Sequence, residues 1–199
     1  MFVQVVRPGG RTSLVSQPRQ GRADAVRNRQ KIIGAARDLI MLHGPDVGMT
    51  EIASAAGVAV GTLYRHYPTK ADLVAAVVSE YVEQIVRQIE AACQRVAQGA
   101  HAADELDALL REAVEASVSQ AALKALATSP GLSGSRTAER RAKRAFQALI
   151  ESAKHDGDLR SDITVGDIYL LVGSAPTLAT PPNRERWLVL MLAALRQSR

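Results

Sequence analysis

The sequence predicts an all-α protein, and three observations lead to this prediction. Hydrophobic residues make up 47% of the 199 residues, enough for a sizeable core, whereas aromatic residues make up only 4%. Alanine and leucine dominate where a sheet protein would carry β-branched and aromatic residues. Apolar residues also recur three and four positions apart along most of the chain, which is the spacing of one helix face.

The start of the chain lacks that spacing. Residues 1–21 mix Gly, Pro, Ser, Gln and Arg without a helical period, so we expect a disordered basic arm. The simpler interpretation of this arm is a dispensable leader, and the alternative is an extension that reaches a nucleic-acid backbone or minor groove. A first helix is expected from about Arg22 to His43, where Gly44 and Pro45 end it.

The stretch from Met49 to Lys70 predicts two short helices joined by a tight turn. Gly57 stands where the first of them would end in left-handed backbone, which glycine adopts at little cost. Pro68 prevents the second helix from continuing. Helices joined by so few residues must cross steeply, and a residue as small as Ala53 lets their backbones approach. This pattern predicts a helix-turn-helix, whose second helix lies in the DNA major groove.

A long helix is expected next, from Lys70 to about Arg95. Thr69 is a suitable N-cap and Asp72 follows three residues later, close to a capping box. This helix gives the strongest periodic signal of the chain. Its apolar stripe consists of Leu73, Val74, Val77, Val78, Tyr81, Val82 and Ile85.

Five further helices complete the expected fold, over about 104–119, 121–127, 137–154, 164–178 and 184–196. Basic residues in the first half of the third are interpreted as a solvated face rather than a second phosphate patch: Arg140, Arg141, Lys143 and Arg144. Apolar residues nearly encircle the last helix: Trp187, Leu188, Leu190, Met191, Leu192 and Leu195. We therefore expect it to pack against a second subunit as well, the alternative being burial within one chain.

Charge is distributed unevenly along the sequence. Residues 1–70 contain 10 Lys and Arg against 4 Asp and Glu, a net charge of +6, whereas residues 71–199 contain 15 against 16, a net charge of −1. The positive charge thus coincides with the predicted helix-turn-helix, as contact with phosphates requires.

The second helix of the motif and its flanks carry the candidate DNA contacts. These are Ala59, Val60, Gly61, Thr62, Tyr64, Arg65, His66 and Lys70. Thr62 can hydrogen-bond a base, and Val60 can contact a thymine methyl group. Tyr64, His66 and Lys70 are better suited to hold phosphates, which fixes the register of the protein on the duplex. Leu63 and Tyr67 are expected to face the core.

These residues resemble the DNA-binding signature of the tetracycline-repressor (TetR) family. The resemblance covers about 27–78 and rests on Ile52-Ala53, Ala56-Gly57-Val58 and the run from Gly61 to Lys70, with Ile32, Ala35, Ala36, Leu39 and Gly44 in the preceding helix. Two positions depart from the family pattern: Gly48 replaces a frequent Ser or Thr cap, and Ala59 replaces a frequent Ser. A third, Tyr67 in place of the common Phe, adds a hydroxyl to the core.

The resemblance implies an all-α homodimer, usually a repressor, that binds DNA through its N-terminal head. It also implies a small-molecule effector that binds in the C-terminal body and moves the connecting helix. By position, Thr62, Tyr64, His66 and Lys70 are the implied DNA contacts, with residues 59–61 near the bases.

No enzyme, cofactor or metal site is expected. The glycine and serine residues over 131–135 lack the strand and the spacing of a nucleophile elbow. Cys93 is the only cysteine, and the four histidines form no pair at metal-ligand spacing. No apolar run is long enough to cross a bilayer.

The sequence thus predicts a cytoplasmic, homodimeric DNA-binding regulator, most simply a repressor released from a near-palindromic operator by a small molecule. We expect an arm over 1–21, a DNA-binding domain over 22–69, and an effector-binding and dimerisation domain over 70–199. The alternatives are an activator of the same type and a helical ligand-binding or interaction protein without a functional operator.

Overall fold

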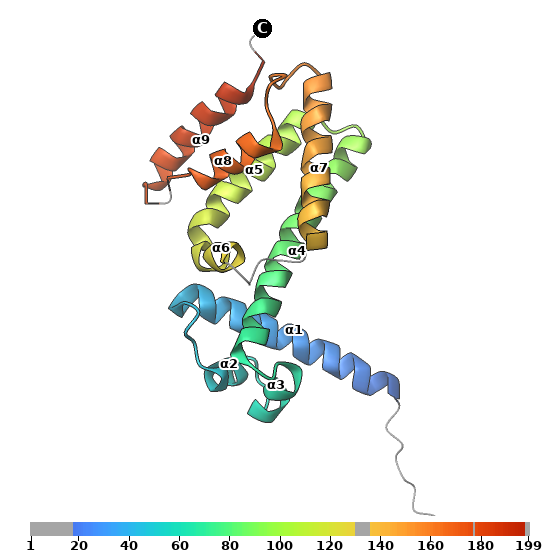
Figure 1. Ribbon diagram of the computed structural model, residues 1–199, viewed down its shortest axis with the longest axis vertical. Coiled ribbons are helices and arrows are strands. Elements are labelled where there is room, and N and C mark those ends of the chain that lie inside the picture. Colours follow the sequence, from blue (N-terminus) through green and yellow to red (C-terminus); the bar gives the residue numbers. More distant parts are fainter. Residues whose placement is uncertain (1–17, 130–135, 177, 198–199) are drawn as a thin grey trace, which may run out of the picture.

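The computed structural model describes residues 18–129, 136–176 and 178–197, and these residues form nine α-helices and no β-strand (Figure 1). The helices are α1 (Pro18–His43), α2 (Met49–Ala55), α3 (Val60–His66), α4 (Lys70–Ala97), α5 (Ala102–Ser119), α6 (Ala121–Thr128), α7 (Arg136–His155), α8 (Val165–Gly173) and α9 (Pro181–Leu195). The predicted all-α fold is confirmed. None of the described helices is both long enough and apolar enough to span a membrane.

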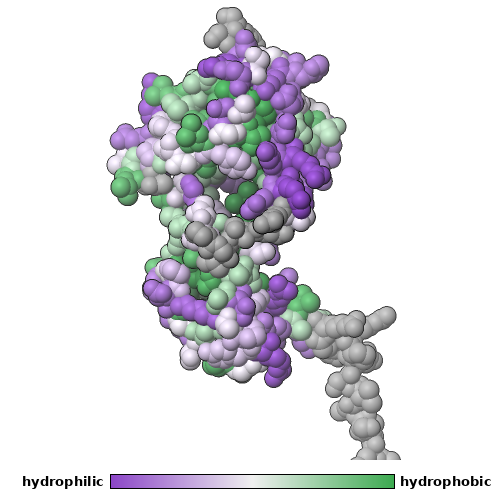
Figure 2. Space-filling model, in the orientation of Figure 1, coloured by the Kyte–Doolittle hydropathy of each residue, from purple (hydrophilic) through white to green (hydrophobic). Residues whose placement is uncertain are grey.

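The helices form two lobes that share α4 (Figure 1). The head consists of α1, α2, α3 and the first turns of α4 to Val78, whereas the body consists of the rest of α4 with α5 to α9. Each lobe has its own hydrophobic core, and Val82 of α4 packs against both cores. The space-filling view shows the lobes one above the other, with the head below (Figure 2).

Helix α4 begins where the sequence predicts, because its capping box is present. The Thr69 hydroxyl accepts a hydrogen bond from the backbone N–H of Asp72 at 3.1 Å, and the Asp72 carboxylate accepts one from the N–H of Thr69 at 3.0 Å. From there α4 runs for 28 residues, about 42 Å at 1.5 Å per residue. It therefore passes from the head core through most of the body (Figure 1).

Several helix ends differ from expectation. Helix α1 begins at Pro18, four residues before the predicted start, while the rest of the predicted arm lies outside the described residues. Helix α8 ends at Gly173 rather than near residue 178, and α9 begins at Pro181 rather than at residue 184. The N–H groups at the first positions of a helix have no acceptor within the helix, so proline, which lacks this N–H, is well tolerated there. The Pro181–Pro182 pair is therefore a suitable helix start, which the apolar periodicity alone did not reveal.

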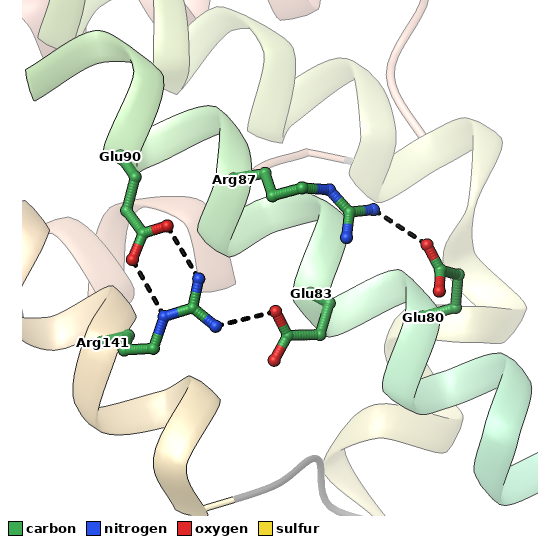
Figure 3. A network of polar contacts seen from close by, with 5 residues as sticks. All are labelled: Glu80, Glu83, Arg87, Glu90 and Arg141. Carbon is green, nitrogen blue, oxygen red and sulfur yellow. Dashed lines mark hydrogen bonds and ion pairs between the residues drawn. The ribbon is translucent and has the colours of Figure 1, made fainter. Parts of the chain in front are cut away.

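One residue of the basic run in α7 is not part of a solvated face, as had been predicted. Arg140, Lys143 and Arg144 are exposed as expected, but Arg141 turns toward α4. Its guanidinium donates hydrogen bonds to the carboxylates of Glu90 and Glu83, both on α4 (Figure 3). The prediction was wrong for Arg141 because the sequence of α7 does not reveal which of its faces packs on α4.

Candidate nucleic-acid interface

The turn between α2 and α3 has the hydrogen bonds of a Schellman motif. The N–H of Gly57 donates to the carbonyl of Ser54 at 3.1 Å, and the N–H of Val58 donates to the carbonyl of Ala53 at 3.0 Å. Gly57 adopts a φ of +64°, the left-handed conformation predicted from the sequence. This glycine therefore ends α2 and lets α3 start at Val60, three residues later.

Buried side chains fix α3 against the rest of the head. Leu63 is fully buried and Tyr67 nearly so, which confirms that both face the core. They share that core with Ile52 of α2 and Leu73 of α4. Burial of a leucine side chain contributes about 1.5–3 kcal/mol, so Leu63 alone stabilises the placement of α3 substantially.

The opposite side of α3 and its flanks are accessible to a DNA duplex. Tyr64 and Val60 have exposed fractions of 46% and 37%. Of the other candidate contacts, three are exposed and three are half-buried: Ala59, Gly61 and Arg65, then Thr62, His66 and Lys70. All eight residues lie between positions 59 and 70 of the sequence, and the fold leaves each of them accessible.

The N-terminus of α3 has no side-chain cap. Ala59 is the N-cap residue, and its carbonyl accepts from the N–H groups of Thr62 at 2.8 Å and Leu63 at 3.2 Å. The N–H groups of Val60 and Gly61 precede the first intrahelical bonds and so have no acceptor within the helix. The small residues at 59 and 61 also leave the backbone open to close approach.

Some cations of the head have acid partners and others do not: Arg27 and Arg37 pair with Asp24 and Asp38 on α1. In the body, Arg95 pairs with Glu105 at 2.7 Å and Arg196 with Asp107 at 2.5 Å. In the part of the chain that the structure describes, Arg65 and Lys70 form neither an ion pair nor a side-chain hydrogen bond. The same is true of Arg29 and Lys31 on α1. Cations without acid partners on α1, on α3 and at the start of α4 contribute the positive potential that attracts phosphates.

The body contains a cavity of about 470 Å³, which sequence periodicity did not reveal. Its apolar wall includes Val82, Ile85, Ile89, Leu109, Phe146, Ile168 and Val172. The lining residues come from α4, α5, α6, α7 and α8, so only the packed fold assembles them. A cavity of this size lies within the range of small-molecule sites.

One group of possible metal ligands occurs among the described residues. His101, Asp156 and Asp158 have ligand atoms within 4.8 Å of one another, and the Nδ1 of His101 lies 3.3 Å from Asp158 Oδ2. His101 and Asp156 are exposed at the surface. Because exposed acidic groups beside a histidine are common at protein surfaces without an ion, we assign no metal to this group.

Helices α2 and α3 form a steeply joined pair, the second helix of the pair is accessible, and the pair belongs to an all-α protein. These features define the class of protein: a helix-turn-helix DNA-binding protein. Comparisons with known proteins then specify the family. The family model of the bacterial regulatory proteins of the tetR family matches residues 32–77. A TetR transcription regulatory protein from Mycobacterium vanbaalenii has 30% sequence identity and a TM-score of 0.69, over 88% of this chain and 98% of that chain.

Two further relatives agree. A TetR transcriptional regulator from Streptomyces coelicolor is 26% identical with a TM-score of 0.66, over 86% of this chain and 99% of that chain. An HTH-type transcriptional regulator from Staphylococcus aureus is 40% identical over 75 residues, which are 36% of this chain and 39% of that protein. The chain therefore belongs to the TetR family of DNA-binding transcriptional regulators. This is a family of regulators rather than enzymes, in agreement with the sequence.

Proposed function

We propose that the protein is a cytoplasmic, homodimeric repressor that leaves a near-palindromic operator when a small molecule binds in its body. The observation that carries this proposal is the course of α4. Its first residue, Lys70, belongs to the candidate DNA interface, and its later residues Ile85 and Ile89 line the cavity. A ligand that favours one position of α4 therefore shifts the head between a bound and a released arrangement.

The accessible side of α3 supports the proposed roles of its residues. Thr62 and Val60 read bases, with residues 59–61 close to the groove floor. Tyr64, Arg65, His66 and Lys70 hold phosphates on either side. Two heads related by a two-fold axis would occupy half-sites about 34–36 Å apart, one turn of the duplex.

Apolar side chains left exposed on α8 and α9 support dimerisation through the C-terminal helices. Leu170 of α8 has an exposed fraction of 71%, and Leu190 of α9 one of 48%. Tyr169 and Val189 beside them are exposed as well. Large apolar side chains left exposed are typical of a surface that a protein–protein interface covers.

A similar protein supports the effector. A structure described as a gamma-butyrolactone receptor is 27% identical with a TM-score of 0.59, over 84% of this chain and 85% of that chain. The name assigns a small-molecule ligand to that protein. In this chain the cavity against α4 offers the corresponding kind of site.

We propose three functional units with the boundaries expected from the sequence: an arm over 1–21, a DNA-binding unit over 22–69 and an effector-binding and dimerisation unit over 70–199. The last four residues of the arm, from Pro18, already belong to α1.

Titration of the full-length protein against DNA from its own upstream region tests the proposal. We expect a specific complex whose affinity falls steeply between about 50 and 200 mM salt, because phosphate contacts release counterions. Footprinting should show two protected half-sites. Absence of a protected site in any candidate region would contradict the proposal and favour a helical ligand-binding protein. Stimulated rather than blocked transcription from the bound promoter would instead identify an activator.

A further inference from the structure

We infer that the cavity of the body takes a mainly apolar molecule that ends in a carboxylate, and that Lys124 of α6 recognises this group. The inference rests on the proposed function, in that it names the chemical class of the proposed effector. It depends on three features of the cavity: its apolar lining, the polar side chains where α5 meets α6, and the ammonium group of Lys124, which has no acid partner among the described residues.

The cavity wall combines an apolar surface with two groups of polar residues. The apolar surface comes from aliphatic side chains of α4, α5 and α8 and from Phe146 of α7. One polar group lies along α4 and α5: Gln84, Gln88, Glu112 and Glu115. The other lies where α5 meets α6: Ser117, Ser119, Gln120, Lys124 and Thr128. A ligand that fits the apolar surface and the second group has an apolar body and one polar end.

The polar end has unused hydrogen-bond donors. Lys124 is half-buried, and its ammonium donates to the carbonyl of Val172 on α8 at 3.3 Å. An ammonium has three donors, so two stay available. Among the described residues no carboxylate lies within ion-pair distance of Lys124, and the amide of Gln120 has no side-chain partner. Donors without acceptors on a cavity wall favour an acceptor-rich ligand group.

The acidic groups of the wall have partners of their own. The carboxylate of Glu112 accepts a hydrogen bond from the amide of Gln88 on α4. Glu115 is two-thirds exposed and lies 3.7 Å from Arg184 of α9. Neither acid neutralises Lys124. Among ligand groups, a carboxylate should form the strongest hydrogen bonds with the Lys124 ammonium, because hydrogen bonds between charged groups are about twice as strong as neutral ones.

The position of Lys124 also links the ligand to the head. Helix α6 lies at the end of the body nearest the head, beside α1 (Figure 1). Leu123, the residue before Lys124, is fully buried in the head core. A ligand that draws Lys124 toward its carboxylate therefore acts on a helix that is itself anchored in the head.

Calorimetric titration of the full-length protein with three probes of equal chain length tests the inference: sodium decanoate, methyl decanoate and 1-decanol. We expect decanoate to bind at least about tenfold more tightly than the two neutral probes. Lys124→Met should weaken decanoate binding at least about tenfold and leave methyl decanoate within about twofold. Lys124→Arg should keep the preference for decanoate, and Lys143→Met, which removes an exposed lysine of α7 outside the cavity, should change nothing.

Equal affinities for the three probes would overturn the inference, as would absence of decanoate binding or an unchanged affinity in Lys124→Met. Circular dichroism of each variant checks that it is folded. Release of DNA is measured separately, by fluorescence anisotropy. Lys124-dependent binding of decanoate without release of DNA would support this ligand class and contradict the proposed release mechanism. Release by another compound, with no binding of decanoate, would support the mechanism and overturn the ligand class.

Discussion

The guanidinium of Arg141 on α7 meets the carboxylate of Glu90 on α4 edge to edge, with its Nε and Nη2 atoms 2.9 and 2.7 Å from the two oxygens (Figure 3). Its Nη1 atom donates to Glu83 at 2.9 Å, two turns earlier on α4. One side chain thus links α7 to two points of the helix that carries the head. Arg87, by contrast, pairs with Glu80 of its own helix at 2.8 Å.

The contact between Arg141 and Glu90 predicts that Arg141→Met lowers the stability of the fold by an amount that depends on pH. The hydrogen bonds from Arg141 lower the pKa of Glu90 below its ordinary value of 4.5. A carboxyl group with a lowered pKa in the folded state stabilises the fold above its unfolded pKa, and that contribution is lost as the pH falls through the folded pKa. Arg141→Met should therefore lower the thermal unfolding midpoint at pH 7, and the difference from wild type should shrink below pH 4.5.

Arg87→Met is the matched control for that experiment, because its ion pair joins residues of one helix. It should change the unfolding midpoint less than Arg141→Met does. If both variants behave alike, or if the Arg141→Met difference grows in acid, the link between α4 and α7 does not contribute as described.

Gly57→Ala should destabilise the head. The φ of +64° at this position costs a residue with a Cβ about 1–2 kcal/mol. Gly61 offers the comparison, since it lies inside α3 and a Cβ there would meet open space. Gly61→Ala should leave stability unchanged or raise it by up to about 1 kcal/mol. Urea denaturation measures both, and similar losses in the two variants would argue against the left-handed turn.

The same Gly61→Ala variant separates folding from DNA binding. We expect it to bind operator DNA more weakly although its fold is intact, because the added methyl group lies where the backbone of α3 is proposed to approach the bases. An unchanged affinity would place the groove contacts elsewhere on the helix.

Tyr67→Phe should make the protein more stable. The hydroxyl of Tyr67 is buried and has no hydrogen-bond partner among the described residues. Removal of an unsatisfied buried hydroxyl is expected to raise the free energy of unfolding by on the order of 1 kcal/mol, or the thermal midpoint by about 2–4 °C. Tyr64→Phe should leave the midpoint unchanged, because Tyr64 is exposed at the surface. A clear loss of stability in Tyr67→Phe would mean that the hydroxyl has a partner.

Substitutions on α3 should divide into two classes when tested on a panel of operator variants. Thr62→Ala should change which bases are preferred. Tyr64→Ala and Lys70→Ala should weaken binding to all sequences alike, and Lys70→Ala should reduce the salt slope by about one. Lys143→Ala, in the body, serves as the control. A uniform loss of affinity in Thr62→Ala would contradict its proposed reading role.

Leu190→Arg and Leu170→Arg should convert a dimer into single chains of 21.3 kDa in analytical ultracentrifugation. Both residues are exposed on the helices proposed for the interface, and a buried unpaired charge there is strongly unfavourable. Leu42→Arg is the control, because Leu42 of α1 in the head is as exposed as Leu170 and more exposed than Leu190. Leu188 is unsuitable for this test, although the sequence pattern included it. It is only 5% exposed, so an arginine there would disrupt the body's own core.

Sequence reasoning predicted the helix-turn-helix well because the signals that form it are local. The left-handed Gly57, the stop at Pro68 and the capping box of Thr69 with Asp72 depend on residues within a few positions of one another. The alternation of Leu63 and Tyr67 with exposed neighbours is equally local. This alternation also indicated which face of α3 is exposed to solvent.

The sequence by itself thus determined the class of fold, the helix-turn-helix motif and which face of α3 is accessible. Only the tertiary structure decided that Arg141 pairs with acids more than fifty positions away, that Leu123 of the body enters the head core, and that Lys124 lies unpaired on a cavity wall. The physical reason is that helix periodicity indicates that a face is apolar without indicating which helix covers it. A cavity, an ion pair between helices and a shared core arise only when distant segments pack.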